Sequence, residues 1–108
     1  MKYQINITAK AARDLDEAAD YIEYTLLNSK AADDLLDKVE TEIQKLAFMP
    51  QKHSIIDDPV FAAWEIRMIA IRNYLAFYVI DEDDKTVYIV RCLYGKRNWN
   101  DILRNGLR

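Results

Sequence analysis

The chain has 108 residues, of which 51% are hydrophobic and 31% charged, and its formal net charge is −3. This composition is typical of a globular protein, so we expect residues 1–108 to form one domain. The single cysteine, single histidine and two glycines exclude an intrachain disulfide, a metal site built from several cysteines or histidines, and a glycine-rich phosphate loop, and we expect neither metal nor cofactor.

The chain also lacks the sequence features of membrane insertion. Its opening residues, MKYQINIT, contain no apolar block of signal-peptide length. No stretch approaches the ~20 apolar residues that a membrane-spanning helix needs. We therefore expect a cytoplasmic protein with no membrane partner.

The first half of the chain predicts one strand and two helices. Tyr3–Thr8 alternates between apolar and polar side chains, as a strand with one buried face does. Apolar residues then recur at steps of three and four over Ala9–Leu27, and again from the break at Asn28 and Ser29 to Pro50. Two amphipathic helices joined by so short a break predict an antiparallel helical hairpin.

The second half predicts three strands and a short helix. Gln51–Phe61 is polar and predicts a loop, and the apolar period then changes to two. The expected strands are Trp64–Ile71, Tyr74–Ile80 and Thr86–Leu93, and the expected helix is Asn98–Leu103. The order β-α-α-β-β-β-α predicts a two-layer α+β fold, with the helical hairpin packed on one face of a small, mainly antiparallel sheet.

Basic side chains on or beside the late strands form a candidate binding surface. Residues 1–60 contain 7 basic and 12 acidic side chains, whereas residues 61–108 contain 8 and 6, and four of those six acids lie in Asp81–Asp84. Because guanidinium groups bind phosphate or carboxylate bidentately, we expect an anion- or partner-binding strip on the open face of the sheet. Structural ion pairs, for example with Glu65 or Asp101, are the alternative. The acids of the first helix, Asp14 among them, are expected to be solvated. The binding candidates are Arg67, Arg72, Arg91, Lys96 and Arg97.

Other chemically capable residues are most simply interpreted as structural. Tyr94 could stack on a base or donate a proton, although such a tyrosine more often packs at a sheet edge. We expect His53 to be a solvated loop residue, Cys92 a buried thiol, and Trp64 and Trp99 core anchors. No catalytic triad, metal set or carboxylate pair can be identified.

The order and spacing of five segments resemble the RelE/ParE superfamily of toxins from type II toxin–antitoxin pairs. The segments are YQINIT, AARDLDEAADYI, AADDLLDKVETEIQKLAFMP, IRMIAIRNYLAFYVID and VYIVRCLYGKRNW, within about Tyr3 to Leu103. The resemblance implies a bacterial or archaeal cytoplasmic toxin that is held inactive by a small antitoxin, whose C-terminal part wraps the toxin surface. It also implies one of two targets: RelE-like members cleave mRNA on the ribosome, and ParE-like members poison DNA gyrase.

The resemblance distinguishes these two activities in part. Arg97 matches a catalytic arginine of RelE-like nucleases, but Leu75 stands where they often have arginine and Leu103 where they have a late tyrosine. Together with the acidic balance, these differences favour a ParE-like inhibitor that acts by binding over an mRNA endonuclease. A non-toxic protein-binding module is a third possibility, and whether the chain is an enzyme stays open. For a nuclease, the catalytic candidates are Arg67, Arg91, Arg97 and Tyr94.

Overall fold

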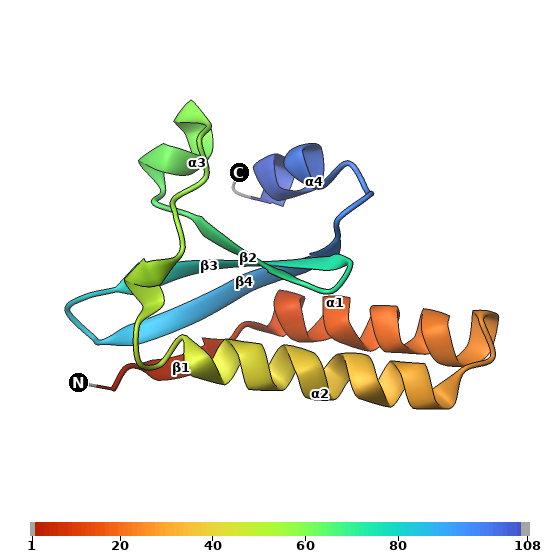
Figure 1. Ribbon diagram of the computed structural model, residues 1–108. Coiled ribbons are helices and arrows are strands. Elements are labelled where there is room, and N and C mark those ends of the chain that lie inside the picture. The colour runs from red at the N-terminus through yellow and green to blue at the C-terminus, as the bar shows by residue number, and fades with distance from the viewer. Residues whose placement is uncertain (1, 107–108) are drawn as a thin grey trace.

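A four-stranded sheet lies between two groups of helices in the computed structural model, which describes residues 2–106 (Figure 1). The strands are β1 (Gln4–Ile7), β2 (Arg67–Ile71), β3 (Tyr74–Asp81) and β4 (Thr86–Tyr94). The helices are α1 (Ala9–Asp20), α2 (Ser29–Lys45), α3 (Pro59–Ala63) and α4 (Trp99–Gly106). A π-helical turn, η1 (Tyr21–Thr25), continues α1, and a 3-10 turn, η2 (Pro50–Lys52), precedes α3. The expected α+β class and mainly antiparallel sheet are confirmed.

The strands lie in the order β1-β4-β3-β2. β2 pairs with β3 and β3 with β4 in antiparallel fashion, whereas β1 pairs with β4 in parallel. The sequence predicted the strands but not this order, because periodicity reports which face of a strand is buried and not which strand lies beside it.

The predicted helical hairpin covers one face of the sheet (Figure 1). Thr8 caps α1: its Oγ1 accepts a hydrogen bond from the Ala11 N–H and donates one to the Ile89 carbonyl, which ties the start of the helix to β4. Asn28 caps α2 by accepting from the Ala31 N–H. Apolar side chains of both helices and of this sheet face form the larger core, including Ala11, Leu35, Val39, Ile43, Ile69, Tyr78, Val87 and Ile89.

The other face of the sheet is not open, contrary to expectation. Helices α3 and α4 lie on this side (Figure 1), and a second core forms beneath them. The centroid of the Trp99 ring lies 5.3 Å from that of Phe77, which confirms Trp99 as a core anchor. Because β3 is apolar on both faces, it supplies Tyr78 to one core and Phe77 to the other. The buried members of the second core are Phe61, Ile66, Phe77, Leu93 and Leu103.

Helix α3 begins inside the segment predicted as a loop, so that prediction is wrong from Pro59 onward. The Asp58 Oδ1 accepts hydrogen bonds from the N–H groups of Val60 and Phe61, and Pro59 occupies the first turn. An aspartate followed by proline is a helix-start signal, because the carboxylate caps free N–H groups and proline lacks one. The signal was present in the sequence.

Trp64 is not the core anchor that the strand pattern predicted. It ends α3 and its side chain is 59% exposed, and β2 begins only at Arg67. The alternation of apolar residues begins before the strand because Ile66 already packs into the second core.

A β-bulge in β4 explains why Arg91 shares sequence parity with buried residues. Phe77 pairs with Arg91 but Tyr78 pairs with Ile89, so Val90 is an extra residue. A bulge of this kind reverses the faces of the residues that follow it. Arg91 therefore leaves the apolar row of Val87 and Ile89, and Cys92 takes its place in the larger core.

Candidate functional site

Three of the five predicted binding residues gather at one corner of the molecule. The turn between β2 and β3 carries Arg72, and the loop after β4 carries Lys96 and Arg97. The Gly95 N–H donates to the Asn73 carbonyl at 2.7 Å, which fastens the loop to the turn. A Cβ on Gly95 would lie 3.2 Å from that carbonyl oxygen, so glycine permits the close approach. We call Arg72, Lys96 and Arg97 the cationic corner.

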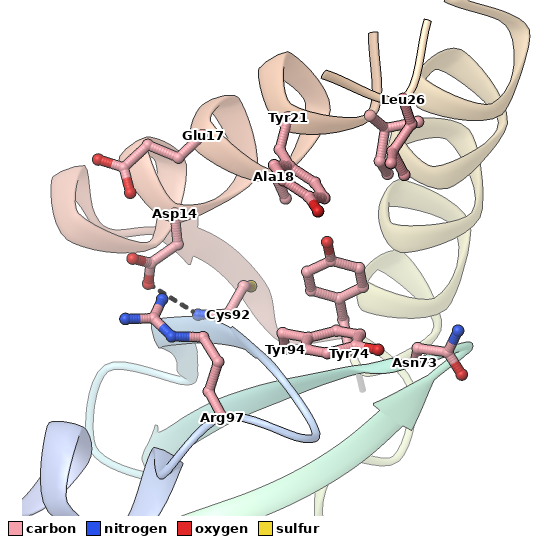
Figure 2. Close-up of a pocket in the computed structure, with 11 residues that line it drawn as sticks. Asp14, Glu17, Ala18, Tyr21, Leu26, Asn73, Tyr74, Cys92, Tyr94 and Arg97 are labelled. Atoms are coloured by element: carbon pink, nitrogen blue, oxygen red, sulfur yellow. Dashed lines mark hydrogen bonds between the residues drawn. The ribbon is translucent and has the colours of Figure 1, made fainter. Parts of the chain in front are cut away.

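A cavity of about 560 Å³ lies next to this corner, between the α1–η1 segment and the ends of β3 and β4. Three tyrosines line it: Tyr21 comes from η1, and Tyr74 and Tyr94 from the strands (Figure 2). The centroids of the Tyr74 and Tyr94 rings are 5.5 Å apart. The Arg97 side chain extends from the loop toward the wall formed by α1 (Figure 2). We call this cavity the tyrosine cleft.

The phenol group of Tyr74 is neutral at physiological pH. Burial, followed by the neighbouring Tyr94 and Tyr21 hydroxyls, raises the pKa of Tyr74 above the ordinary 10.0. The predicted buried thiol is confirmed, since Cys92 is 4% exposed and burial raises its pKa to about 12. A protonated, buried thiol is a poor nucleophile.

Arg91 is held by an ion pair at the wall of the cleft. Its Nε donates to Asp14 Oδ2 at 2.7 Å and one terminal nitrogen to Asp14 Oδ1 at 2.9 Å. The same carboxylate accepts from the Cys92 N–H at 3.0 Å. Only 10% of the Asp14 side chain is exposed, so the expectation that it belongs to a solvated helix face is wrong.

Arg67 lies apart from the other candidates, at the opposite end of β2 from the turn. Its guanidinium donates to the backbone carbonyls of Gln51 and His53 and so fixes the η2 loop to the sheet. His53 is half-buried rather than fully solvated. These contacts support a structural role for Arg67.

Leu75 and Leu103, the two positions that the resemblance compares with RelE-like nucleases, both lie at the second core. Leu103 belongs to α4 and is 1% exposed, and Leu75 packs against the same cluster from β3. Arg97 instead lines the tyrosine cleft, where Cys92 of the larger core also lies. An apolar cluster therefore occupies the two positions where the resemblance places the arginine and tyrosine of a nuclease.

Sequence reasoning missed Asp14, Tyr21 and Tyr74 as parts of the site. Each fits its local pattern as a helix-surface or strand residue, and only tertiary contact brings them together. The part of the chain that the structure describes contains no trio of His, Cys, Asp or Glu side chains arranged for a metal ion. Nor does any helix within residues 2–106 have the length and apolar character needed to cross a membrane.

Comparison with protein families gives one match. The family described as "ParE toxin of type II toxin-antitoxin system, parDE" matches residues 5–99. Comparison with curated protein sequences gives no significant match.

Solved structures with the same fold include toxins from three bacteria. A chain of the chromosomal ParDE system of P. aeruginosa aligns with a TM-score of 0.70 and 18% identity, over 86% of this chain and 96% of that one. A chain of the RelBE2 toxin–antitoxin complex of Mycobacterium tuberculosis aligns at 0.60 and 20%, over 87% and 99%. A free double mutant of the E. coli toxin RelE aligns at 0.60 and 12%, over 97% and 98%.

Proposed function

This chain belongs to the ParE toxin family of type II toxin–antitoxin systems, and we propose that it arrests growth by binding DNA gyrase, with no catalytic residues of its own. A cognate antitoxin is its second protein partner. Within this proposal the cationic corner contacts the target. We also propose a cytoplasmic location, where such a target lies.

The observation that carries the proposal is the second core. Leu75 and Leu103 occupy the two positions at which the resemblance expects nuclease groups, and they pack with Phe77 and Leu93 between α4 and the sheet. A buried apolar cluster offers no hydrogen-bond donor to a scissile phosphate and no group that can move a proton. This arrangement favours a toxin that acts by binding.

The remaining nuclease candidates do not converge on one point. Arg91 is occupied by Asp14, and Arg67 by two backbone carbonyls at the far end of β2. Stabilising the charge of a transition state requires donors already aimed at the same atom. Of the four catalytic candidates, only Arg97 and Tyr94 line the tyrosine cleft.

The net charge of −3 also favours a protein target over RNA. A protein that binds nucleic acid gains much of its affinity when lysine and arginine release phosphate counterions. An acidic protein with one compact group of three cations can gain little affinity from this counterion release.

The test is inhibition of gyrase supercoiling by the purified toxin. We expect inhibition by the wild type and at least a tenfold weaker effect, on the order of a small interface cluster, when Arg72, Lys96 and Arg97 are all changed to alanine. The matched control changes the exposed Lys10, Arg13 and Lys52 to alanine. It alters the net charge equally and should leave inhibition unchanged.

The alternative function is a ribosome-dependent mRNA endonuclease, and the shared position of Arg97 and Tyr94 in the cleft favours it. Site-specific cuts in translated mRNA that disappear in Arg97→Ala would establish it and refute gyrase binding as the mode of action. Growth that continues normally when the toxin is expressed without antitoxin would instead indicate a non-toxic binding module.

A further inference from the structure

Exposed apolar side chains gather at the tip of the helical hairpin, at the mouth of the tyrosine cleft. Within residues 2–106, nine large apolar side chains are exposed, and four of them lie between positions 21 and 27. These are Tyr21, Tyr24, Leu26 and Leu27, which are 54%, 68%, 56% and 84% exposed. Tyr21 and Leu26 also line the cleft (Figure 2). A dense apolar patch beside a concavity is typical of a surface that binds another protein.

The backbone of the tip departs from ordinary helix geometry where these side chains emerge. The chain forms the π-helical turn η1 over Tyr21–Thr25, and Leu27 then takes a left-handed conformation with φ of 54°. π-helical turns are rare and frequent at functional sites, and a left-handed leucine is strained. Both irregularities fall in the segment that exposes the apolar patch.

Carboxylates flank the patch on the helical side. Glu17 lines the cleft. The Glu23 carboxylate, and Asp20 with it, raise the pKa of Tyr24, so both acids lie near that ring. We call Glu17, Asp20 and Glu23 the acidic wall. None of the three makes an ion pair among the residues that the structure describes.

The cationic corner flanks the cleft on the side of the strand ends, and its three members likewise have no carboxylate partner within residues 2–106. Three acids and three cations therefore lie on two sides of the patch without neutralising one another. A partner of a single charge sign would place like charges against one of the two groups.

Such a surface is complementary to a second copy of itself. A two-fold axis makes every contact twice, because a residue of either copy meets the same residue of the other. If the axis passes through the apolar patch, the acidic wall of each copy faces the cationic corner of the other. The apolar tips then meet between the two charged contacts.

We propose that the free toxin forms a homodimer through this surface, with Tyr21, Tyr24 and Leu26 of both copies at its centre. Because the patch is small, the dimer is transient rather than obligate. The inference rests on this surface alone and is independent of whether the target is gyrase or mRNA. Since we also propose that the cationic corner contacts the target, the dimer must dissociate before the toxin acts.

The test is sedimentation velocity of the purified toxin without antitoxin, over a dilution series in about 0.15 M salt. We expect a monomer–dimer equilibrium for the wild type. A corner-reversed variant carries Arg72→Glu, Lys96→Glu and Arg97→Glu, and a wall-reversed variant changes all three acids of the acidic wall to lysine. Each places like charges across both contacts, so the dimer Kd of each should rise at least tenfold.

Mixing the two reversed variants is the decisive step. In the mixed dimer the lysine wall faces the glutamate corner, and the native wall faces the native corner, so association should return to the wild-type level. The matched control carries Lys10→Glu, Arg13→Glu and Lys52→Glu, which give the same net charge as the corner-reversed variant but do not line the cleft. It should dimerise like the wild type and should not restore association when mixed with the wall-reversed variant.

A second pair of variants tests the apolar centre without changing any charge. Tyr24→Ala combined with Leu26→Ala removes two side chains that are more than half exposed, so folding should survive and the dimer Kd should rise at least tenfold. Phe48→Ala combined with Met49→Ala is the control, since these side chains are 68% and 67% exposed near the other end of the hairpin. It should dimerise like the wild type.

A wild type that sediments as a monomer even at about 1 mM would overturn the proposal, and the surface would then belong to another partner. So would a dimer that persists unchanged in both reversed variants, because it would form elsewhere, and so would a mixture that fails to associate. A toxin that dimerises as expected but does not inhibit gyrase would support this inference and refute the proposed function.

Discussion

The Asp14 carboxylate replaces a missing strand at the edge of the sheet. β1 pairs with β4 only as far as Ile89, so the Cys92 N–H has no strand partner on that side. Asp14 accepts from this N–H and from two nitrogens of Arg91. One carboxylate thus satisfies the backbone and balances a charge that is four-fifths buried, with 19% of the Arg91 side chain exposed.

Asp14→Ala is expected to lower the free energy of unfolding by about 3 kcal/mol, because it leaves a largely buried guanidinium without its partner. Urea unfolding at pH 7, analysed for both midpoint and slope, measures the change. Asp16→Ala, on the same helix but exposed, should stay within about 0.5 kcal/mol of the wild type. A loss for Asp14→Ala as small as that of this control would mean that the ion pair contributes nothing. Adding Arg91→Met to Asp14→Ala should recover part of the loss.

At the scale of elements, two short helices owe their position to a few contacts. Asp58 caps α3 through Oδ1, and its Oδ2 accepts from the Arg104 guanidinium of α4 at 3.0 Å. Leu103 then fills the space between α4 and the sheet. These contacts hold the layer that closes the second face.

The contribution of Asp58 to the stability of the fold should depend on pH. Partial desolvation raises its pKa, but the Val60 and Phe61 N–H groups and Arg104 outweigh this and hold it below the ordinary 3.8. Because the pKa is lower in the folded state, the stabilisation is complete above about pH 3.8 and is lost as the pH falls through the folded value. Asp58→Asn keeps a good helix cap but loses the ionised group.

Urea unfolding at pH 7 and pH 3 tests this dependence. The wild type should be more stable than Asp58→Asn at pH 7, and the difference should shrink at pH 3. Asp57→Asn, its exposed neighbour, serves as the control and should show no such change. A difference that is the same at both pH values would contradict the assignment.

Leu103→Ala should cost about 3 kcal/mol of unfolding free energy, since it removes a buried side chain and leaves a cavity beneath α4. The near-ultraviolet circular dichroism of Trp99 should weaken as the helix loosens. Leu27→Ala gives the comparison, because Leu27 is 84% exposed, and it should change stability by less than about 0.5 kcal/mol. Equal stability of the two variants would show that α4 is not anchored by this side chain.

At the scale of the whole molecule, one sheet is shared by two cores. β3 sends Tyr78 to the larger core and Phe77 to the second. Neither core can lose its sheet face without disturbing the other, so the chain should unfold as one cooperative unit.

Urea unfolding followed by two signals checks this cooperativity. Far-ultraviolet circular dichroism is dominated by the helical hairpin, and the fluorescence of Trp99 in a Trp64→Phe background reports on the second core. We expect both curves to have the same midpoint. An earlier fluorescence transition would show that the second core melts independently of the first.

Several features could be predicted because their cause is local. The hairpin followed from apolar steps of three and four on either side of Asn28, and the strands from a period of two and from β3 being apolar on both faces. Asp58 followed by Pro59 also marked the start of α3, although the loop prediction overlooked it. Of the site, the sequence indicated the cationic side chains, and the family resemblance implied that Leu75 and Leu103 stand where nucleases have polar groups.

The rest depends on contacts between residues far apart in the chain. Asp14 and Arg91 are 77 residues apart in the chain. They meet only because β4 returns to pair with β1, and because a bulge turns Arg91 toward the edge of the sheet. Tyr21 and Tyr74 likewise share a cleft only once the hairpin is packed. Periodicity determines which side of an element is apolar, whereas strand order, register and the occupant of each face are decided by packing the whole chain at once.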